Sequence, residues 1–187
     1  NAIDATENFY QLSVPNHEVR YIYKKRIMTW VERKLKISSE GYVLLARLLL
    51  EGKLAAFEQT LQEFLQQATS FYQTGSKRVE TFYNGFMLAL LSMLSAYYVV
   101  ESEYESGLGK ADVVLIPKAK NNPQALILEY KVCEDPEQLS ATAQAGLQQI
   151  LSKDYAAKVQ WHVHVKKILA VSLAFCGKKV ARACCQL

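Results

Sequence analysis

The sequence predicts one α/β domain, in which a mixed central β-sheet is flanked by helices. Helical periodicity dominates residues 1–98, whereas residues 99–187 contain short apolar segments separated by turn residues, which is typical of strands. A single helical segment between the third and fourth strands predicts a three-strand meander, a crossover helix and two further strands. Of the 187 residues, 50% are hydrophobic and 21% charged, so the chain can bury a core and is not disordered.

Four or five helices are predicted in the first half, because apolar residues recur there about every 3.6 residues. Four of them are located, over residues 17–36, 40–50, 54–72 and 77–98. Asn16 is a favourable N-cap for the first, while Gly52 and Gly75 separate the others. The most apolar window, residues 86–100, is shorter than the ~20 residues of a membrane span. We therefore expect a buried core helix there and no membrane segment.

The second half is predicted to hold five strands and one helix. The strands cover residues 97–104, 111–117, 125–132, 167–175 and 178–184, and the helix covers residues 136–158. Gly107 and Gly109 in the first gap, and Asn121-Asn122-Pro123 in the second, indicate hairpin connections. Together with the preceding helices, these elements predict a single domain over residues 1–187.

Composition narrows the classes of function. Four cysteines without a CxxC pair argue against a disulfide scaffold and favour a reducing, cytoplasmic compartment. His162 and His164 share a strand-like face, but no cysteine or acidic residue stands at ligand spacing, so they do not predict a metal site. The net charge of +4 is too small to indicate nucleic acid by itself. Because residue 1 is Asn rather than Met, we expect one domain of a longer protein.

Three ionisable residues on the predicted strands form the candidate site. Glu129 and Lys131 are two residues apart, so they project together from an otherwise apolar strand. Asp112 begins the preceding strand and lies beside Glu129 if the two strands pair as a hairpin. Two carboxylates among apolar residues need compensation, which Mg²⁺ can supply while it contacts phosphate oxygens. A neighbouring lysine can position a water for attack on a phosphodiester. Glu-x-Lys is, however, also a common pair on an exposed strand face.

A longer pattern surrounds these three residues. It consists of ESGLGKADVVLIPK over residues 105–118 and ALILEYKV over residues 125–132. This pattern resembles the core motif of the PD-(D/E)XK nuclease superfamily, with Ala111 in place of its proline. More narrowly, VPNHEVR at 14–20 and ETFYNGFMLALL at 80–91 are similar to the branch found C-terminal to AAA-ATPase-like domains in bacterial proteins and in endosymbiont toxins. The resemblance implies a restriction-endonuclease-like core.

The resemblance also implies roles for individual residues. The metal ligands of the family fall on Asp112 and Glu129, its catalytic lysine falls on Lys131, and the cofactor it implies is Mg²⁺ or Mn²⁺. The acidic residue that the family carries on its long helix falls on Glu80, which would hold a water in the site. Asn84 stands where this branch often has a histidine, which weakens a direct role for that helix.

Further residues are candidates for positioning and substrate contact. The polar helix positions of related nucleases fall on Gln149 and Tyr155, although residues six apart do not share a face of an ideal helix. Lys110 and Lys118 flank the predicted site and are expected, with Tyr155, to contact substrate. The helix over residues 17–36 carries seven Lys or Arg against two Glu, which is either a phosphate-binding surface or a solvated helix face.

These inferences predict a metal-dependent endonuclease that hydrolyses phosphodiester bonds of DNA. The resemblance implies further domains in the same chain, and a place in the bacterial cytoplasm or, for a toxin, inside a host cell. A homodimer would allow both strands to be cut. Two alternatives remain open, because a fold does not fix a function. One is a catalytically silent module that binds nucleic acid or a protein partner, and the other is a purely structural domain.

Overall fold

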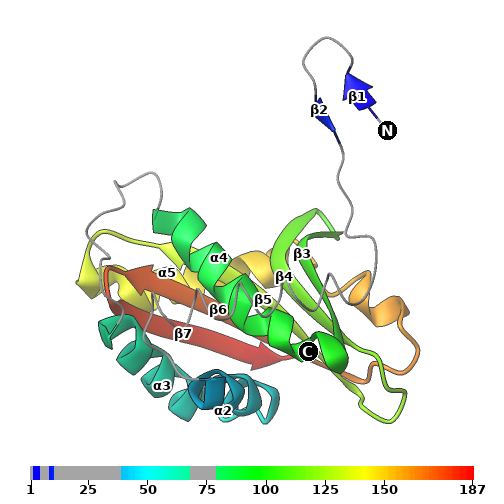
Figure 1. Cartoon of the computed structure of the whole chain (residues 1–187), viewed down its shortest axis with the longest axis horizontal. Coiled ribbons are helices and arrows are strands. Elements are labelled where there is room, and N and C mark those ends of the chain that lie inside the picture. The colour runs from blue at the N-terminus through cyan, green and yellow to red at the C-terminus, as the bar shows by residue number, and fades with distance from the viewer. Residues whose placement is uncertain (1, 5–8, 11–38, 68–78) are drawn as a thin grey trace.

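A five-stranded sheet forms the centre of the computed structural model, which describes residues 2–4, 9–10, 39–67 and 79–187 (Figure 1). The strand order follows the sequence. The strands are β3 (Tyr98–Ser106), β4 (Gly109–Pro117), β5 (Gln124–Val132), β6 (Lys167–Cys176) and β7 (Lys179–Gln186). A separate antiparallel pair, which the sequence analysis did not predict, joins β1 (Ala2–Asp4) to β2 (Phe9–Tyr10).

The connections between the strands explain why the sheet is mixed. Strands β3, β4 and β5 form an antiparallel meander, β5 pairs with β6 in parallel, and β6 pairs with β7 in an antiparallel hairpin. A parallel pair cannot be joined by a tight turn. The crossover from β5 to β6 is made by η4 (Pro136–Gln138) and α5 (Leu139–Ser152). The predicted mixed sheet with one crossover helix is therefore confirmed, and it is consistent with a restriction-endonuclease-like core.

Helices cover both faces of the sheet. On one face lie α2 (Ser39–Leu50), α3 (Leu54–Gln67) and α4 (Val79–Ser92), and on the other lies α5 (Figure 1). Along β5, Leu126 and Leu128 pack with the three-helix face, whereas Ala125 and Ile127 pack with α5. A strand covered on both sides has an almost continuous apolar sequence. A charged residue in the middle of β5 therefore needs a specific explanation.

The long apolar window at residues 86–100 is not one helix, so the predicted helix over 77–98 is too long. It is divided between the end of α4, the 3₁₀-helix η3 (Met93–Ala96) and the start of β3. Residues 86–100 are almost all apolar and can be buried in a helix or in a strand, so their hydrophobic pattern did not show where α4 ends and β3 begins. No helix in the part of the chain that the structure describes is long and apolar enough to cross a membrane. The helix predicted over residues 17–36 lies outside the described residues.

The end of α5 also differs from the prediction, which extended this helix to residue 158. The helix ends at Ser152, and Asp154 adopts a left-handed backbone conformation with φ of 51°. Aspartate is one of the few side chains that occupies this region readily, so the helix ends without a glycine. A turn over residues 153–158 then leads to the short 3₁₀-helix η5 (Val159–Trp161).

Helix α5 lies unusually close to the sheet at Gly146. A Cβ atom on Gly146 would lie 2.1 Å from Ser172 Oγ and 3.2 Å from Lys131 Cγ. Ser172 is fully buried on β6, directly opposite Glu129 in the β5–β6 register. The absence of a side chain at Gly146 therefore lets α5 pack against the part of the sheet that carries Glu129 and Lys131.

Gly146→Ala is expected to destabilise the protein by about 1–3 kcal/mol, since the new methyl group would overlap Ser172 Oγ. The higher helix propensity of alanine stabilises the variant by ~1 kcal/mol and offsets only part of this loss. Ser172→Ala removes the overlapping oxygen, so the double variant should recover most of the lost stability. Urea unfolding of both single variants and the double variant measures this coupling, and purely additive effects would contradict the close contact.

Candidate active site

The two carboxylates of the candidate site meet where the strands β4 and β5 separate. Val113 pairs with Leu128, and one step further along the same register Asp112 would face Glu129, but the ladder ends before that step. Instead, Asp112 Oδ2 accepts a hydrogen bond of 2.6 Å from the backbone N–H of Tyr130. The Asp112 side chain therefore takes the place of a backbone partner, and its carboxylate is held against β5.

The other neighbour of β4 is irregular at the same level. On β3, Ser102 pairs with Val113 and Tyr104 pairs with Ala111, but the intervening Glu103 is not paired with Asp112. Glu103 has φ of 49°, a left-handed conformation that is uncommon for a residue other than glycine. The regular ladder is thus interrupted on both sides of Asp112, as is frequent next to functional sites.

Glu129 is buried in the centre of the sheet, with only 2% of its surface exposed. Its Oε1 accepts two hydrogen bonds, of 2.8 Å from Lys131 Nζ and 2.7 Å from Gln149 Nε2. Its Oε2 is also buried and has no hydrogen-bond partner among the described residues. Burial raises the pKa of the Glu129 carboxyl, the hydrogen bond from Lys131 opposes this rise, and the charge of Asp112 adds to it.

Gln149 and Tyr155 join the site as a hydrogen-bonded pair, which the helix-face argument did not anticipate. Gln149 Nε2 donates to the Tyr155 hydroxyl at 2.9 Å, because α5 ends at Ser152 and Tyr155 therefore lies outside the helix, with its N–H bonded to Ile150 O. Tyr155 is 2% exposed and contacts the β3–β4 turn, where a Cβ on Gly109 would lie 3.2 Å from its hydroxyl. Tyr155 thereby holds Gln149 against Glu129 and links the helix end to the hairpin.

The donor set is suited to a magnesium-type cation. Mg²⁺ is commonly held by one or two carboxylates and completes its coordination with waters and substrate phosphates. Asp112 and Glu129 provide two such carboxylates, and the unpartnered Glu129 Oε2 is a buried acceptor in need of a positive partner. Among the described residues there is no group of three or more His, Cys, Asp or Glu side chains that could hold a metal ion. A cation held here would therefore take two carboxylate ligands from the described residues and its remaining ligands from water and substrate.

The placement of the other predicted site residues differs from one to the next. Glu80 belongs to the first turn of α4, and its side chain lies outside the described residues, as does that of Asn84. Lys118 follows the end of β4 remote from Asp112 and donates a hydrogen bond of 2.6 Å to Ser95 O. Lys110 is exposed, two residues before Asp112, and forms an ion pair of 3.4 Å with Glu105.

Two structural features, one beside the site and one at the far end of β4, were missed by sequence reasoning. One is the Gly146–Ser172 contact, for which the only signals were a glycine inside a predicted helix and a serine inside an apolar strand. The other is the position of the two histidines, which lie in a loop instead of on a strand. Their ring centroids are 6.0 Å apart, and His164 Nε2 lies 2.7 Å from Pro117 O, which ties this loop to the end of β4.

Comparison with protein families locates the same region. A model described as the PD-(D/E)XK nuclease superfamily matches residues 78–184, from the start of α4 to the end of the sheet. Neither a search of curated proteins nor a search of solved structures found a match. The matched segment is more than half of the 187 residues and contains Asp112, Glu129 and Lys131. The chain belongs to the PD-(D/E)XK nuclease superfamily.

Proposed function

We propose that the chain is an endonuclease that hydrolyses phosphodiester bonds of DNA with Mg²⁺ or Mn²⁺ as its cofactor. The observation that carries the proposal is the meeting of Asp112, Glu129 and Lys131 at the opening between β4 and β5. A buried carboxylate oxygen without a partner is costly, and a bound cation would remove that cost. Membership of a nuclease superfamily supports hydrolysis of a phosphodiester as the reaction.

Each side chain of the site would have a separate function in the proposed reaction. Gln149 and Lys131 fix the orientation of the Glu129 carboxylate through its Oε1 and leave Oε2 available. A cation held by Asp112 and Glu129 would act as a Lewis acid on the phosphoryl oxygen. The Lys131 side chain is 31% exposed, so its ammonium can donate to an attacking water as well as to Glu129. The same positive charge would stabilise the negative charge that develops on the phosphoryl group.

A catalytically silent module is the second candidate, and one contact favours it. The ion pair of 2.8 Å between Lys131 and Glu129 already compensates part of the buried charge without a cation. In such a module the same three residues would maintain the fold, while the surface would bind nucleic acid or a protein partner. The cleavage experiment below separates the two candidates.

The wider setting is part of the same proposal. Resemblance to the branch found beside AAA-ATPase-like domains supports residues 1–187 as one domain of a larger bacterial protein or toxin. Such a protein would act in the bacterial cytoplasm or in a host cell. A homodimer would place two sites on opposite strands of a duplex.

Metal binding is expected to stabilise the folded chain. A saturating concentration of Mn²⁺ or Mg²⁺, about a hundredfold above Kd, should raise the melting temperature by roughly 5–10 °C, and EDTA should reverse the rise. Asp112→Asn should abolish this shift, because it removes one of the two ionised ligands. Calorimetry with each metal measures it, and an equal shift in the variant would exclude Asp112 as a ligand.

Glu129→Gln is expected to stabilise the metal-free protein while it weakens metal binding. The substitution replaces a buried carboxylate, one oxygen of which has no partner among the described residues, by a neutral amide of similar shape. We expect a gain of about 1–2 kcal/mol, or roughly 2–8 °C in melting temperature in EDTA. The exposed residue Glu101 on β3 provides the control variant Glu101→Gln. Loss of stability in Glu129→Gln would show that the ion pair with Lys131 outweighs the burial cost.

Lys131→Ala is expected to reduce metal-dependent cleavage of DNA by at least about 100-fold, as removal of a proton-handling or charge-stabilising group commonly does. Supercoiled plasmid and single-stranded DNA are incubated with Mg²⁺, Mn²⁺ or EDTA, and product is followed on gels. Lys179→Ala, at an exposed lysine on β7, is the control and should cleave as the parent does. Cleavage that persists in Lys131→Ala would remove Lys131 from the mechanism, and a parent chain that cleaves nothing with any metal would favour the silent module.

A further inference from the structure

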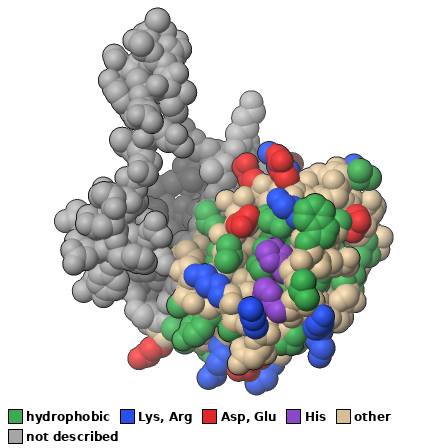
Figure 2. All heavy atoms as spheres, turned by 90° about the vertical axis from the view of Figure 1, so that its right-hand side faces the viewer, with side chains coloured by type: hydrophobic (Ala, Val, Ile, Leu, Met, Phe, Trp, Pro, Cys, Tyr) green, Lys and Arg blue, Asp and Glu red, His purple; other side chains and the backbone are tan. Residues whose placement is uncertain are grey.

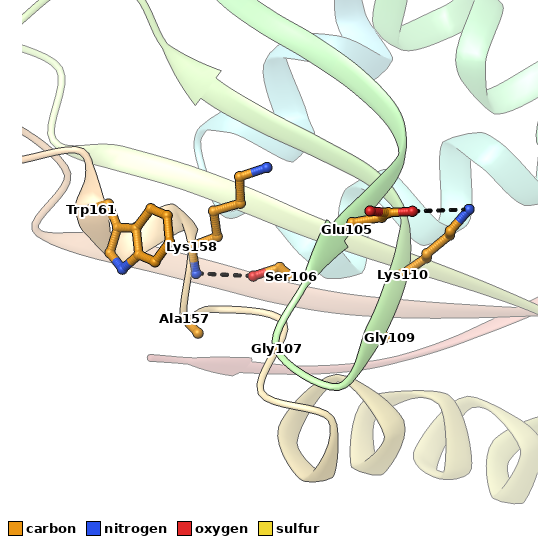
Figure 3. Close-up of a pocket in the computed structure, with 8 residues that line it drawn as sticks. All are labelled: Glu105, Ser106, Gly107, Gly109, Lys110, Ala157, Lys158 and Trp161. Carbon is orange, nitrogen blue, oxygen red and sulfur yellow. Dashed lines mark hydrogen bonds and ion pairs between the residues drawn. The ribbon is translucent and has the colours of Figure 1, made fainter.

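A groove of about 600 Å³ lies between the β3–β4 hairpin and the segment that follows α5. Figure 3 shows residues of the hairpin, including Glu105 and Lys110, on one side and Lys158 and Trp161 on the other. Trp161, at the end of η5, is 75% exposed. An indole with so little contact in the core contributes little to folding, so its flat face is available to a ligand.

The walls of the groove are firmly held together. The N–H of Leu108 donates to Lys153 O at 2.7 Å, and the N–H of Lys158 donates to Ser106 Oγ at 2.9 Å. Gly107 has φ of +58°, and a Cβ there would lie 2.1 Å from Lys153 O, so only glycine permits this close approach. The hairpin and the segment after α5 therefore form one preformed surface.

This surface continues into the candidate active site. Lys110, in the hairpin wall, precedes Asp112 by two residues, which is about 7 Å along an extended strand. Gly109, also in the wall, contacts Tyr155, which is hydrogen-bonded to Gln149 of the site. A chain molecule lying in the groove would thus have its next units beside the two carboxylates.

The Trp161 side of the groove carries a net positive charge, whereas the β3–β4 hairpin carries three exposed glutamates against Lys110. Residues 153–167 contain four exposed lysines and one aspartate. Figure 2 shows this side of the molecule, with basic side chains on several sides of the two histidines. Lys158 Nζ lies 4.7 Å from the centre of the Tyr104 ring, which holds the ammonium beside the groove. The ion pair between Lys110 and Glu105 is exposed on both sides and therefore weak, so a phosphate can replace Glu105.

We propose that this groove binds a single strand of DNA next to the cleavage site, with an unpaired base stacked on Trp161 and phosphates on Lys158 and Lys110. The inference rests on the proposed nuclease function and narrows its substrate. Exposed aromatic rings beside lysines are the usual means of holding single strands, because every base has a face to stack. In a duplex both faces of each base are covered by neighbours, so Trp161 selects DNA that is unpaired beside the cut. A protein partner would require a larger continuous apolar surface than Trp161, its exposed neighbour Val163 and Leu108 of the hairpin provide between these lysines.

Binding can be measured without cleavage. Fluorescence anisotropy in EDTA compares a labelled oligothymidylate with an abasic strand of equal length and charge. We expect the oligothymidylate to bind more tightly, and Trp161→Ala to weaken it about 5- to 150-fold, as loss of one stacked base does. Trp161→Phe should restore most of the affinity, and Val163→Ala, at an 82% exposed neighbour, should leave it unchanged. Lys158→Ala should weaken the binding of both DNA strands and reduce the slope of log K against log salt by about 1.

Tryptophan fluorescence provides a second measurement. The chain has two tryptophans, so quenching by DNA that is seen in the parent and lost in Trp161→Phe is assigned to Trp161.

The outcomes separate this inference from the proposed reaction. Equal affinity for the oligothymidylate and the abasic strand, or undiminished binding by Trp161→Ala, would overturn the stacking proposal even if the chain cleaves DNA. Tighter binding of oligouridylate than of oligothymidylate would overturn the assignment to DNA. Conversely, Trp161-dependent binding without cleavage in any metal would contradict the nuclease and leave the strand-binding groove in place.

Discussion

Burial of the Glu129 carboxylate in the middle of the sheet is the constraint on which the rest of the site depends. On the α5 side of the sheet, to which Glu129 belongs, Ile127 and Ala170 are apolar and buried, and an ionised group in such surroundings costs several kcal/mol unless it is paired. Lys131 and Gln149 compensate one of its two oxygens. Gln149 reaches Glu129 only because α5 lies close to the sheet, and the missing side chain at Gly146 permits that distance. The helix, the crossover and the two hydrogen bonds therefore form one connected arrangement.

A second constraint concerns the backbone around Asp112, because the strands beside it must separate to leave room for a ligand. A carboxylate on a regular central strand would have neighbouring strands at ladder distance on both sides and little room for a ligand. Here the ladder to β5 ends before Asp112, and on β3 the facing Glu103 adopts a left-handed conformation. The hydrogen bond from the Tyr130 N–H to Asp112 satisfies a donor that the interrupted ladder would otherwise leave unpaired. The irregularity thus opens the sheet without leaving this buried polar group unpaired.

The sequence was sufficient for the order of the strands, the crossover helix and the positions of Asp112, Glu129 and Lys131 on β4 and β5, because these depend on local periodicity. It was insufficient where distant residues decide the outcome. The end of α5 depends on the left-handed conformation of Asp154, for which no glycine gave a signal. The contact between Gly146 and Ser172 joins a helix to a strand and has no local pattern. The exposure of Trp161 is equally invisible in sequence, since large aromatic residues are mostly buried.

The parallel pairing of β5 with β6 also affects when the site can exist during synthesis. β6 lies between β5 and β7 in the sheet, yet in the sequence it is separated from β5 by the crossover over residues 133–166. A nascent chain that has reached only the end of α5 would have β5 as an edge strand, with Glu129 hydrated and its partner strand missing. Non-local pairs of this kind form late, because the intervening loop must close first. β6 can pair with β5 only after it has been synthesised and has left the ribosome. The burial of Glu129 beside β6 is therefore completed late in synthesis, after most of the sheet is available.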